Sequence, residues 1–572
     1  MILREIAGLL PKLFRQYPFV SVTGPRQSGK TTLCKAVFTD PGVKYVSLDG
    51  LDVRDRAEDD PRGFLRDIGT PAIIDEVQHV PSLFPYLKES ADSSGANGQY
   101  VLSGSENFAL NEAVSESLAG RVAQLRLLPF SLEERRRAGG AASFPDIAYG
   151  GFYPRIVDQQ LEPRQALADY FETYVERDVR RMGGVGDLPA FRQFAALCAG
   201  RVGSLLDFTS IGDDVGVSRT TVRNWLAVLE RSYIVFLLQP FHANMRKRLV
   251  KTPKIYFYDV GLASYLLGIQ EADQIATHPL RGQLFENIVV AEAVKHCWNN
   301  GRQPRLSFYR ESGGLECDLF YESGRGINAI EAKSGATVAS SWMRPLSRVA
   351  ATVSAITERT VVYGGNQAQS RSDVEVVPLS RFPAALRRFD TESAVLVVCE
   401  GAPVVGAAVL ALFPNGTRRA AATDPGGVAR LELHSDDQPM TVFIAGPGLG
   451  AHISTDWIPA SGALRADLEP LGEGGSVIFE DQTGNLPGIE GRLNPVLDEQ
   501  GRTYLYTTNI AVNGNLSSGA VHFAIGGEPL RLEDANGKRY DLCVVAMRGQ
   551  SSLLEYRTPV EDDRATPRKV GP

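Results

Sequence analysis

The sequence has 572 residues, of which 43% are hydrophobic and 22% are charged, and its formal net charge is -7. At about 150 residues per domain this length predicts roughly four domains, and the composition is that of a globular protein, which excludes long disordered regions. The negative charge excludes a uniformly basic coat for nucleic acid, although it is compatible with a local basic patch.

The six cysteines are scattered and form no C-x-x-C pair. This distribution is typical of reduced thiols in the cytoplasm. No apolar run reaches the roughly 18 residues that span a bilayer, so we expect no membrane partner. Residues 1–14 have the apolar spacing of an amphipathic helix, with charges inside it that a signal peptide would lack. We therefore expect a cytoplasmic protein.

Residues 19–32, FVSVTGPRQSGKTT, lead from a β-branched strand through G-x-x-x-x-G-K-T into a helical pattern. The pattern predicts a phosphate-binding loop for ATP, in which Lys30 contacts the β and γ phosphates and the Thr31 hydroxyl is a ligand of Mg²⁺. The predicted nucleotide-binding residues of this loop are Gly24, Pro25, Arg26, Gln27, Ser28, Gly29, Lys30, Thr31 and Thr32.

A second signal for nucleotide hydrolysis lies in residues 71–78, PAIIDEVQ, a short apolar strand that ends in two carboxylates. Asp75 is expected to hold Mg²⁺ through water, and Glu76 is expected to polarise the attacking water. The strand at 99–105 ends in Ser105. Two roles fit this serine, sensing of the γ-phosphate and capping of a helix.

Arg121 follows in the segment SLAGRVAQLRLLPF. It has the chemistry of an arginine finger, which neutralises charge on the phosphate of its own subunit or of a neighbouring one, so we consider a homo-oligomer. A surface arginine at the start of a strand fits the pattern equally well.

A resemblance to a known family rests on six segments of this part of the chain. They are TGPRQSGKTTL, IIDEVQHVPSLFPYLK, LSGSENFAL, SLAGRVAQLRLLPFSLEE, GGFYPRI and YVERDVRR. They resemble a prokaryotic family of AAA-like P-loop ATPases that carry a helical region and a nuclease-like C-terminal half. The resemblance covers about residues 1–385. It implies an α/β P-loop ATPase domain over 1–150, a helical winged-helix domain over 151–270 and a nuclease-like domain over 271–387.

The middle of the chain has a helix-turn-helix pattern. A short helix is expected from about Thr209, a turn at Gly216 and a second helix capped by Ser218. The second helix is expected to expose four residues for contacts in a DNA groove: Arg219, Thr220, Arg223 and Asn224. Basic residues of a following wing are expected to meet phosphates: Arg246, Lys247, Arg248, Lys251 and Lys254. A winged helix that docks a protein is the alternative.

Residues 282–333 predict a helix followed by three strands. The helix carries Glu286, the second strand Asp318, and the third strand Glu331 and Lys333, which lie on one face because side chains alternate along a strand. This order is similar to the PD-(D/E)xK nuclease fold. The similarity implies that two carboxylates hold Mg²⁺, that Glu286 completes the metal shell or supports it, and that the lysine orients or deprotonates a water. A domain that binds nucleic acid or a protein without cutting it is the alternative.

Beyond residue 390 the sequence becomes rich in short β-runs separated by turn signals. Residues 391–470 are similar to a small transthyretin-like or carboxypeptidase-regulatory-like β-sandwich, and residues 471–572 predict a second β-rich domain. We expect this extension to bind a protein partner or to serve assembly. For the whole chain we expect Mg-ATP hydrolysis coupled to DNA binding or cleavage, with a nucleotide-driven switch as the alternative.

Overall fold

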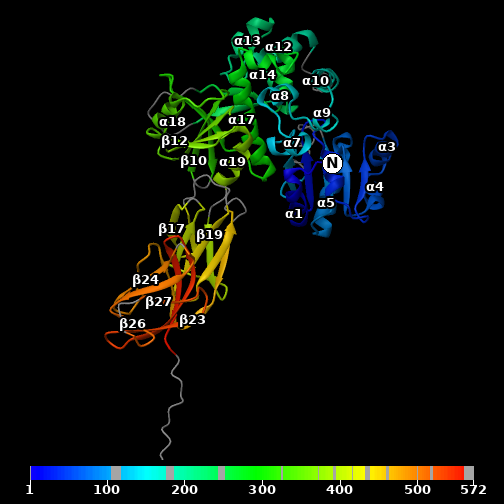
Figure 1. Cartoon of the computed structure of the whole chain (residues 1–572). Helices are drawn as coiled ribbons and strands as arrows, with labels where there is room; N and C mark the ends of the chain where they lie inside the picture. Colours follow the sequence, from blue (N-terminus) through cyan, green and yellow to red (C-terminus); the bar gives the residue numbers. More distant parts are fainter. Residues whose placement is uncertain are drawn as a thin grey trace, which may run out of the picture. The chain divides into compact units, whose positions relative to one another are not determined.

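The computed structural model describes residues 2–104, 118–175, 186–241, 251–323, 326–371, 373–390, 394–414, 416–431, 439–458, 463–498, 500–515 and 520–559. The chain divides into two compact units, residues 1–386 and 387–572 (Figure 1). Within the described ranges, no helix combines the length and the apolar character that crossing a membrane requires.

The N-terminal domain is built on a five-stranded sheet in which every neighbouring pair of strands is parallel. Its strands, in sheet order, are β2 (Lys44–Ser47), β3 (Ala72–Asp75), β4 (Tyr100–Gly104), β1 (Phe19–Thr23) and β5 (Val122–Arg126). The predicted strand at 71–78 ends earlier than expected, because Glu76 has a left-handed backbone with φ of +55°. A strand cannot continue through that conformation.

Helices cover both faces of this sheet. They are η1 (Glu5–Gly8), α1 (Leu9–Gln16), α2 (Lys30–Val37), α3 (Leu51–Asp59), α4 (Pro61–Ile68), η2 (Val77–His79), η3 (Pro81–Leu83) and α5 (Phe84–Ser94). Successive strand residues face opposite cores: Ile73 packs with residues of α1 and α2, and Ile74 with residues of α3, α4 and α5. The expected N-terminal amphipathic helix is present as η1 and α1 and fills the first of these cores.

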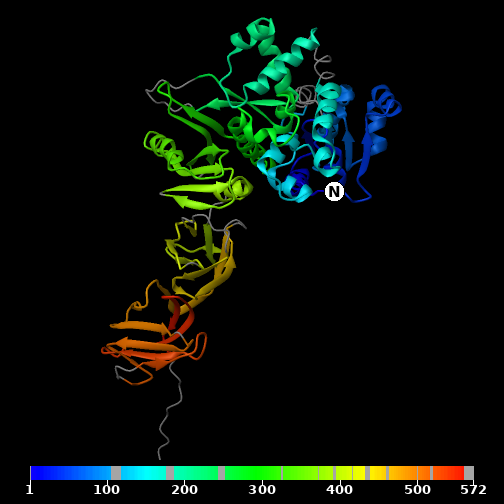
Figure 2. The ribbon, with the colours of Figure 1, turned by 45° about the horizontal axis from the view of Figure 1, so that its top comes forward.

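A helical region follows the first domain (Figure 2). Its elements are α7 (Leu132–Gly139), α8 (Phe144–Gly150), α9 (Pro154–Asp158), α10 (Pro163–Tyr170), the π-helix η4 (Phe171–Val175), α12 (Leu188–Gly200), α13 (Phe208–Val215), α14 (Arg219–Arg231), α15 (Val260–Leu266) and α16 (Gln274–Thr277). The predicted pair of helices around Gly216 is confirmed. Gly216 ends α13 at φ of +80°, and the Ser218 side chain caps α14 by accepting from the Thr221 N–H.

The third part of the unit is an eight-stranded mixed sheet. Its strands, in sheet order, are β12 (Gln369–Arg371), β13 (Val374–Pro378), β11 (Ile356–Tyr363), β10 (Gly326–Lys333), β9 (Glu316–Ser323), β8 (Leu306–Arg310), β6 (Val235–Pro240) and β7 (Lys254–Phe257). Helix α17 (Arg281–Asn299) packs against β7, β9 and β10, and α18 (Met343–Ala350) packs against β9, β10 and β11. The strand after the helix pair therefore joins this sheet, because β6 pairs in parallel with β8.

The second unit, which begins within α19 (Phe382–Asp390), is β-rich, as predicted. Among the residues described there, the strands form four sets, which are β15-β14-β18 with β22, β17-β16-β19-β21, β20-β23-β30-β29-β28-β26, and β24-β25-β27. Their bounds are β14 (Ala394–Cys399), β15 (Ala402–Pro403), β16 (Ala408–Leu412), β17 (Arg418–Ala422), β18 (Val428–Arg430), β19 (Met440–Ala445), β20 (Pro447–Leu449), β21 (His452–Trp457), β22 (Leu464–Leu468), β23 (Pro470–Phe479), β24 (Arg492–Leu497), β25 (Thr503–Thr508), β26 (Ile510–Val512), β27 (Val521–His522), β28 (Leu530–Asp534), β29 (Arg539–Arg548) and β30 (Ser551–Arg557).

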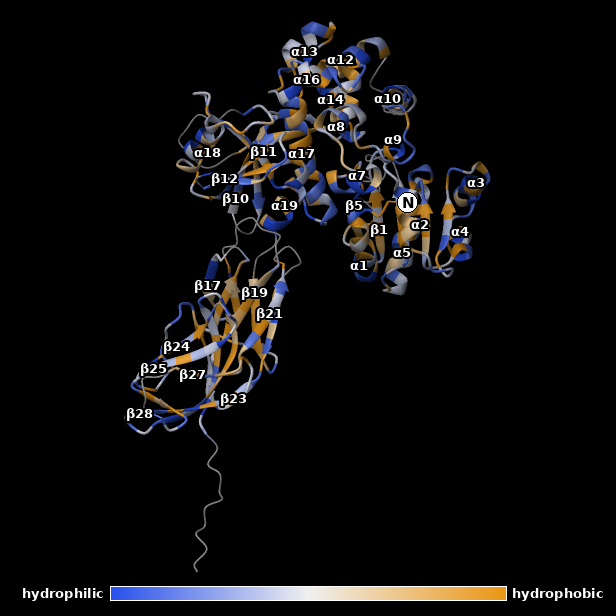
Figure 3. Cartoon of the chain, in the orientation of Figure 1, coloured by the Kyte–Doolittle hydropathy of each residue, from blue (hydrophilic) through white to orange (hydrophobic). Residues whose placement is uncertain are grey.

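Hydrophobic side chains concentrate along the central strands of both units, as β1 and β19 show (Figure 3). Each of these two strands is buried along its whole length. Such continuous burial is expected of a strand that is covered on both faces. The hydrophobic cores of both units therefore lie against the faces of their sheets.

Candidate functional site

The phosphate-binding loop joins β1 to α2 and depends on two glycines. Gly24 has φ of +152°, and a Cβ built on it would lie 2.1 Å from the Leu127 carbonyl oxygen. Gly29 has φ of +89° directly before α2. Both positions therefore require glycine, since a side chain at Gly24 would collide with backbone and the backbone at Gly29 is left-handed.

Lys30 begins α2 and is buried. Its ammonium donates to the carbonyl oxygens of Gly24 at 3.0 Å and Pro25 at 2.9 Å. Burial lowers the pKa of Lys30 to about 8, against the opposing effect of the Glu76 and Asp75 carboxylates. A nucleotide phosphate would supply the negative charge that this buried ammonium lacks, so the loop fits a phosphorylated ligand.

Asp75, at the end of β3, gathers three hydroxyl groups. Its Oδ2 accepts from Thr31 Oγ1 at 2.7 Å and from the Tyr45 hydroxyl at 2.7 Å, and its Oδ1 accepts from Ser103. The structure thus brings the predicted Mg²⁺ ligand Thr31 directly to the predicted carboxylate. A buried carboxylate beside this hydroxyl is the donor set that Mg²⁺ takes next to a nucleotide. Sequence reasoning missed Tyr45, which lies in a strand without any motif. It also chose Ser105 at the end of the strand at 99–105, whereas the hydroxyl that contacts Asp75 in the structure is that of Ser103.

Glu76 lies one residue beyond β3, and its carboxylate accepts a hydrogen bond from Gln78 Nε2. Arg121 lies farther along, before β5, and pairs with Asp92 of α5 at 2.5 Å. None of the Arg121 contacts that the described residues make is with the phosphate-binding loop. Ser105 lies outside the described residues.

The four predicted nuclease-like residues line one cavity of about 640 Å³. Glu286 comes from α17, Asp318 from β9, and Glu331 and Lys333 from β10. Strands β9 and β10 are antiparallel neighbours, with Leu319 paired to Ile330, which places Asp318 beside Glu331. Residues that lie far apart in the sequence therefore meet at one place.

The contacts inside this cavity leave one carboxylate oxygen unsatisfied. Lys333 Nζ donates to Glu331 Oε1 at 2.6 Å, and the Ala332 N–H donates to Asp318 Oδ2 at 2.9 Å. Glu331 Oε2 is buried and has no hydrogen-bond partner in the described structure. A buried carboxylate oxygen without a donor favours either a proton or a cation.

A second lysine, Lys254 at the start of β7, lies in the same cavity. Its ammonium is 2.9 Å from Glu286 Oε1 and 2.7 Å from Glu316 Oε1, and its side chain is 3% exposed. Nearby carboxylates raise the pKa of Lys254 against the effect of burial. The expectation that Lys254 meets phosphates from a wing is therefore wrong, because it is buried as the partner of two carboxylates. Arg246, Lys247 and Arg248 lie outside the described residues.

Burial and mutual repulsion raise the pKa of two of the carboxyls. Burial raises the pKa of Glu286 to about 7 and that of Glu331 to about 8, and Asp318 adds to both shifts. Glu286 is already held through Oε1 by Lys254 and by the Tyr256 hydroxyl at 2.5 Å. Asp318 and Glu331 are therefore the carboxylates best placed for a metal.

The donor set fits a magnesium ion that keeps several waters, because Mg²⁺ is commonly held by only one or two carboxylates. Across the residues that the structure describes, no three or more His, Cys, Asp or Glu side chains form a group suited to a metal ion. The predicted joint ligation by Glu286, Asp318 and Glu331 stays a prediction.

The predicted recognition helix α14 presents its polar face outward. All four predicted contact residues, Arg219, Thr220, Arg223 and Asn224, are exposed. The opposite face is buried, and Trp225 packs edge-on against Phe191 and Phe194 of α12. The exposed face is available to a groove of nucleic acid or to a protein.

Three family models match the first unit. An AAA domain matches residues 16–135, a domain of unknown function, DUF8612, matches residues 141–273, and another, DUF4143, matches residues 281–382. The AAA match confirms the predicted AAA-like P-loop ATPase domain. The loop described above lies within the matched residues.

Two curated relatives come from mycobacteria. They are uncharacterized protein Rv2008c of Mycobacterium tuberculosis and uncharacterized protein Mb2031c of Mycobacterium bovis. Each is 31% identical over 325 residues, which cover 56% of this chain and 72% of the relative.

Solved structures are more distant. A Walker-type ATPase of Pyrococcus abyssi is 15% identical with a TM-score of 0.31, over 46% of this chain and 94% of that chain. RuvB of Thermotoga maritima is 15% identical with a TM-score of 0.23, over 41% of this chain and 89% of that chain.

Proposed function

Because the chain belongs to the same protein family as Rv2008c and Mb2031c and carries an AAA domain at its front, we propose that it is a Mg-ATP-dependent ATPase acting on DNA. Its nucleotide cycle drives the binding of DNA and the cleavage of DNA at the cavity lined by Glu286, Asp318, Glu331 and Lys333, which we call the carboxylate cavity. The observation that carries the proposal is the meeting of Glu286, Asp318, Glu331 and Lys333 in one cavity, where Glu331 Oε2 lacks a partner.

In the ATPase step, the loop amides and Lys30 hold the phosphates, and Lys30 leaves the Gly24 and Pro25 carbonyls to do so. Thr31 would hold Mg²⁺ directly and Asp75 would hold it through water, and the bound ion would supply positive charge beside the phosphate oxygens. Glu76 accepts a proton from the attacking water. Arg121 acts as an arginine finger only after it leaves Asp92.

In the cleavage step, Asp318 and Glu331 would hold a magnesium ion, whose chemistry when bound would be to activate a water and to stabilise the leaving oxygen. Lys333 orients that water from its position on Glu331 Oε1. Glu286, fixed by Lys254 and Tyr256, supports the site from α17. The exposed face of α14 contributes DNA contacts.

The direct test is a Mg²⁺-dependent cleavage assay on plasmid and linear DNA with wild type, Asp318→Ala and Lys333→Ala. We expect the wild type to cut and both variants to lose cutting. Cutting that survives both substitutions contradicts the nuclease assignment. For the ATPase, Glu76→Gln is expected to bind ATP and to hydrolyse it slowly, and hydrolysis at the wild-type rate would contradict the role of Glu76.

A second function is a nucleotide-driven switch in which the nuclease-like cavity is inactive and only binds a nucleic acid or a protein. The observation that favours it is Lys254, whose buried ammonium already neutralises Glu286 and Glu316 where a cation would otherwise bind. Absence of cutting by every form, together with ATP-dependent DNA binding, would support this switch.

A further inference from the structure

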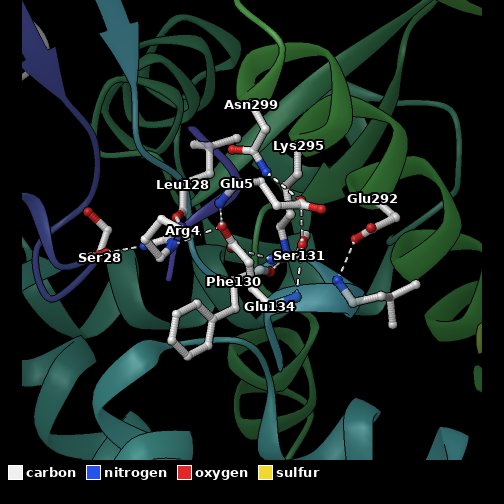
Figure 4. A network of polar contacts seen from close by, with 11 residues as sticks. Arg4, Glu5, Ser28, Leu128, Phe130, Ser131, Glu134, Glu292, Lys295 and Asn299 are labelled. Carbon is white, nitrogen blue, oxygen red and sulfur yellow. Dashed lines mark hydrogen bonds and ion pairs between the residues drawn. The ribbon is translucent and has the colours of Figure 1, made fainter. Parts of the chain in front are cut away.

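Arg4, just before η1, is a buried arginine that joins three segments of the first unit, and Figure 4 shows its surroundings. Its Nη1 donates to the Ser28 carbonyl oxygen of the phosphate-binding loop at 2.7 Å, and its Nη2 donates to the Leu128 carbonyl oxygen at 2.7 Å. Its Nε lies 3.0 Å from Glu134 Oε1, with exposed side-chain fractions of 6% for Arg4 and 0% for Glu134. The planar guanidinium thus donates two hydrogen bonds and forms an ion pair with Glu134, an arrangement that a lysine cannot reproduce, while Nε makes no hydrogen bond in the described structure.

Glu134 fixes Arg4 from the first turn of α7. Its other oxygen accepts from the Ser131 N–H at 2.9 Å, as part of the box that caps this helix. The Glu5 N–H also donates to Glu134 Oε1 at 2.7 Å. The start of α7 and the N-terminal segment are therefore one hydrogen-bonded body around the arginine.

Helix α17 holds the same segment from the other side. Glu292 Oε2 accepts from the Leu132 N–H at 2.9 Å, and Lys295 Nζ donates to the Phe130 carbonyl oxygen at 2.9 Å. Asn299 Nδ2 donates to Glu5 Oε2 at 3.1 Å. The spacing of these three helix residues places them on one face of α17.

The same helix also lines the carboxylate cavity. Glu286, nearly two turns before Glu292 on this helix, accepts from Lys254 and Tyr256 in the cavity. Arg281, the first residue of α17, donates to the Ser334 carbonyl oxygen at 2.7 Å, one residue after Lys333. One rigid helix therefore touches the Arg4 cluster near its C-terminal end and the carboxylate cavity near its N-terminal end.

We propose that Arg4 is a positioning residue for ATP hydrolysis that also couples the phosphate-binding loop to α17 and, through it, to the carboxylate cavity. This inference rests on the proposed ATPase function and adds a route for its regulation. When nucleotide binds, the Lys30 ammonium exchanges its hydrogen bonds to the Gly24 and Pro25 carbonyls for contacts with phosphate. The backbone conformation of the loop then changes beside Ser28, whose carbonyl oxygen accepts from Arg4. Such a coupling needs an element that both sites bias, and the buried polar cluster supplies it.

The test uses the full chain as wild type, Arg4→Met and Arg4→Lys. Binding of a fluorescent ATP analogue, kcat and KM for ATP hydrolysis, and hydrogen exchange of the α17 amides with and without nucleotide are measured. In the wild type we expect nucleotide to slow exchange in α17. Arg4→Met is expected to keep KM within about 2-fold, to lower kcat about 10-fold and to lose the change in α17, and Arg4→Lys is expected to recover part of kcat.

The matched control is Arg62→Met, which removes an arginine from an exposed pair with Glu89 in the same domain. It is expected to leave kcat, KM and the α17 response unchanged. A wild type that binds nucleotide without any change in α17, or an Arg4→Met chain that keeps both kcat and the change, overturns the coupling alone. A wild type that binds no nucleotide overturns the proposed ATPase function and the coupling with it.

Discussion

The phosphate-binding loop and the carboxylate cavity are built in opposite ways. The loop is one continuous stretch whose shape is set by Gly24 and Gly29, and its charged groups stand next to backbone donors and acceptors. The cavity collects its groups from β7, β9, β10 and α17, and it holds charge by pairing lysines with carboxylates. A local motif therefore defines the first site, whereas tertiary packing defines the second.

This difference predicts that the removal of a lysine has different effects at the two sites. Lys30→Ala is expected to reduce ATP hydrolysis about 1,000-fold, because a charge that stabilises the transition state is lost. The free energy of unfolding should fall little, since burial of the Lys30 ammonium is costly and its hydrogen bonds to described residues go to the Gly24 and Pro25 carbonyls. Steady-state ATPase assays and urea unfolding measure the two effects. Hydrolysis close to the wild-type rate would contradict the assignment of the loop.

Lys254→Met is expected to lower the free energy of unfolding of the first unit by about 3 kcal/mol, because Glu286 and Glu316 would lose their buried partner beside Asp318. Chemical unfolding followed by circular dichroism measures this change. Lys333→Met, whose side chain is 31% exposed, is the matched comparison and should cost clearly less. Equal losses of unfolding free energy would contradict the prediction that the buried ion pairs of Lys254 contribute more to stability than the partly exposed pair of Lys333 with Glu331.

The pH dependence of nucleotide binding tests the buried charge of the loop. Burial lowers the pKa of Lys30 to about 8, so the nucleotide-free chain loses this positive charge as the pH rises through 8. Affinity for an ADP analogue without metal should therefore be constant below pH 7 and fall above pH 8, by up to about 10-fold per pH unit. Lys30→Arg should bind with no such fall, because arginine stays charged. Fluorescence titration at several pH values provides the measurement, and a flat wild-type profile up to pH 10 would be inconsistent with this pKa.

The smallest expected effect concerns α14, where the contacts are exposed. Arg223→Ala should weaken DNA binding by severalfold and reduce the salt dependence of the binding constant by about one phosphate contact. Fluorescence anisotropy at several salt concentrations measures both quantities. Unchanged affinity with normal folding would favour a protein partner for this helix, and Arg62→Ala serves again as the exposed control.

The same contrast explains what the sequence could predict. The loop, the helix pair around Gly216 and the strand ending at Lys333 follow from local patterns of glycine, caps and alternation, and the structure contains them. The strand at 71–78 ends earlier than its pattern predicts, because the backbone of Glu76 is left-handed. The expectation that Lys254 contacts phosphates is wrong, because the sequence around a lysine in a basic run does not indicate whether its side chain will be buried. Its role depends on β7 lying beside α17 and β9, which is a long-range contact.

The pairing of β6 with β8 also decides how the chain can be divided. The sequence suggested a boundary near residue 270, yet β6 and β7 lie before it and complete the sheet that carries Asp318 and Glu331. A fragment that starts at residue 271 would leave β8 as a bare edge, prone to pairing with other chains. It would also lack the lysine that neutralises Glu286 and Glu316. The helical part of the chain therefore contributes two strands and a buried lysine to the sheet, and the two parts depend on each other for folding.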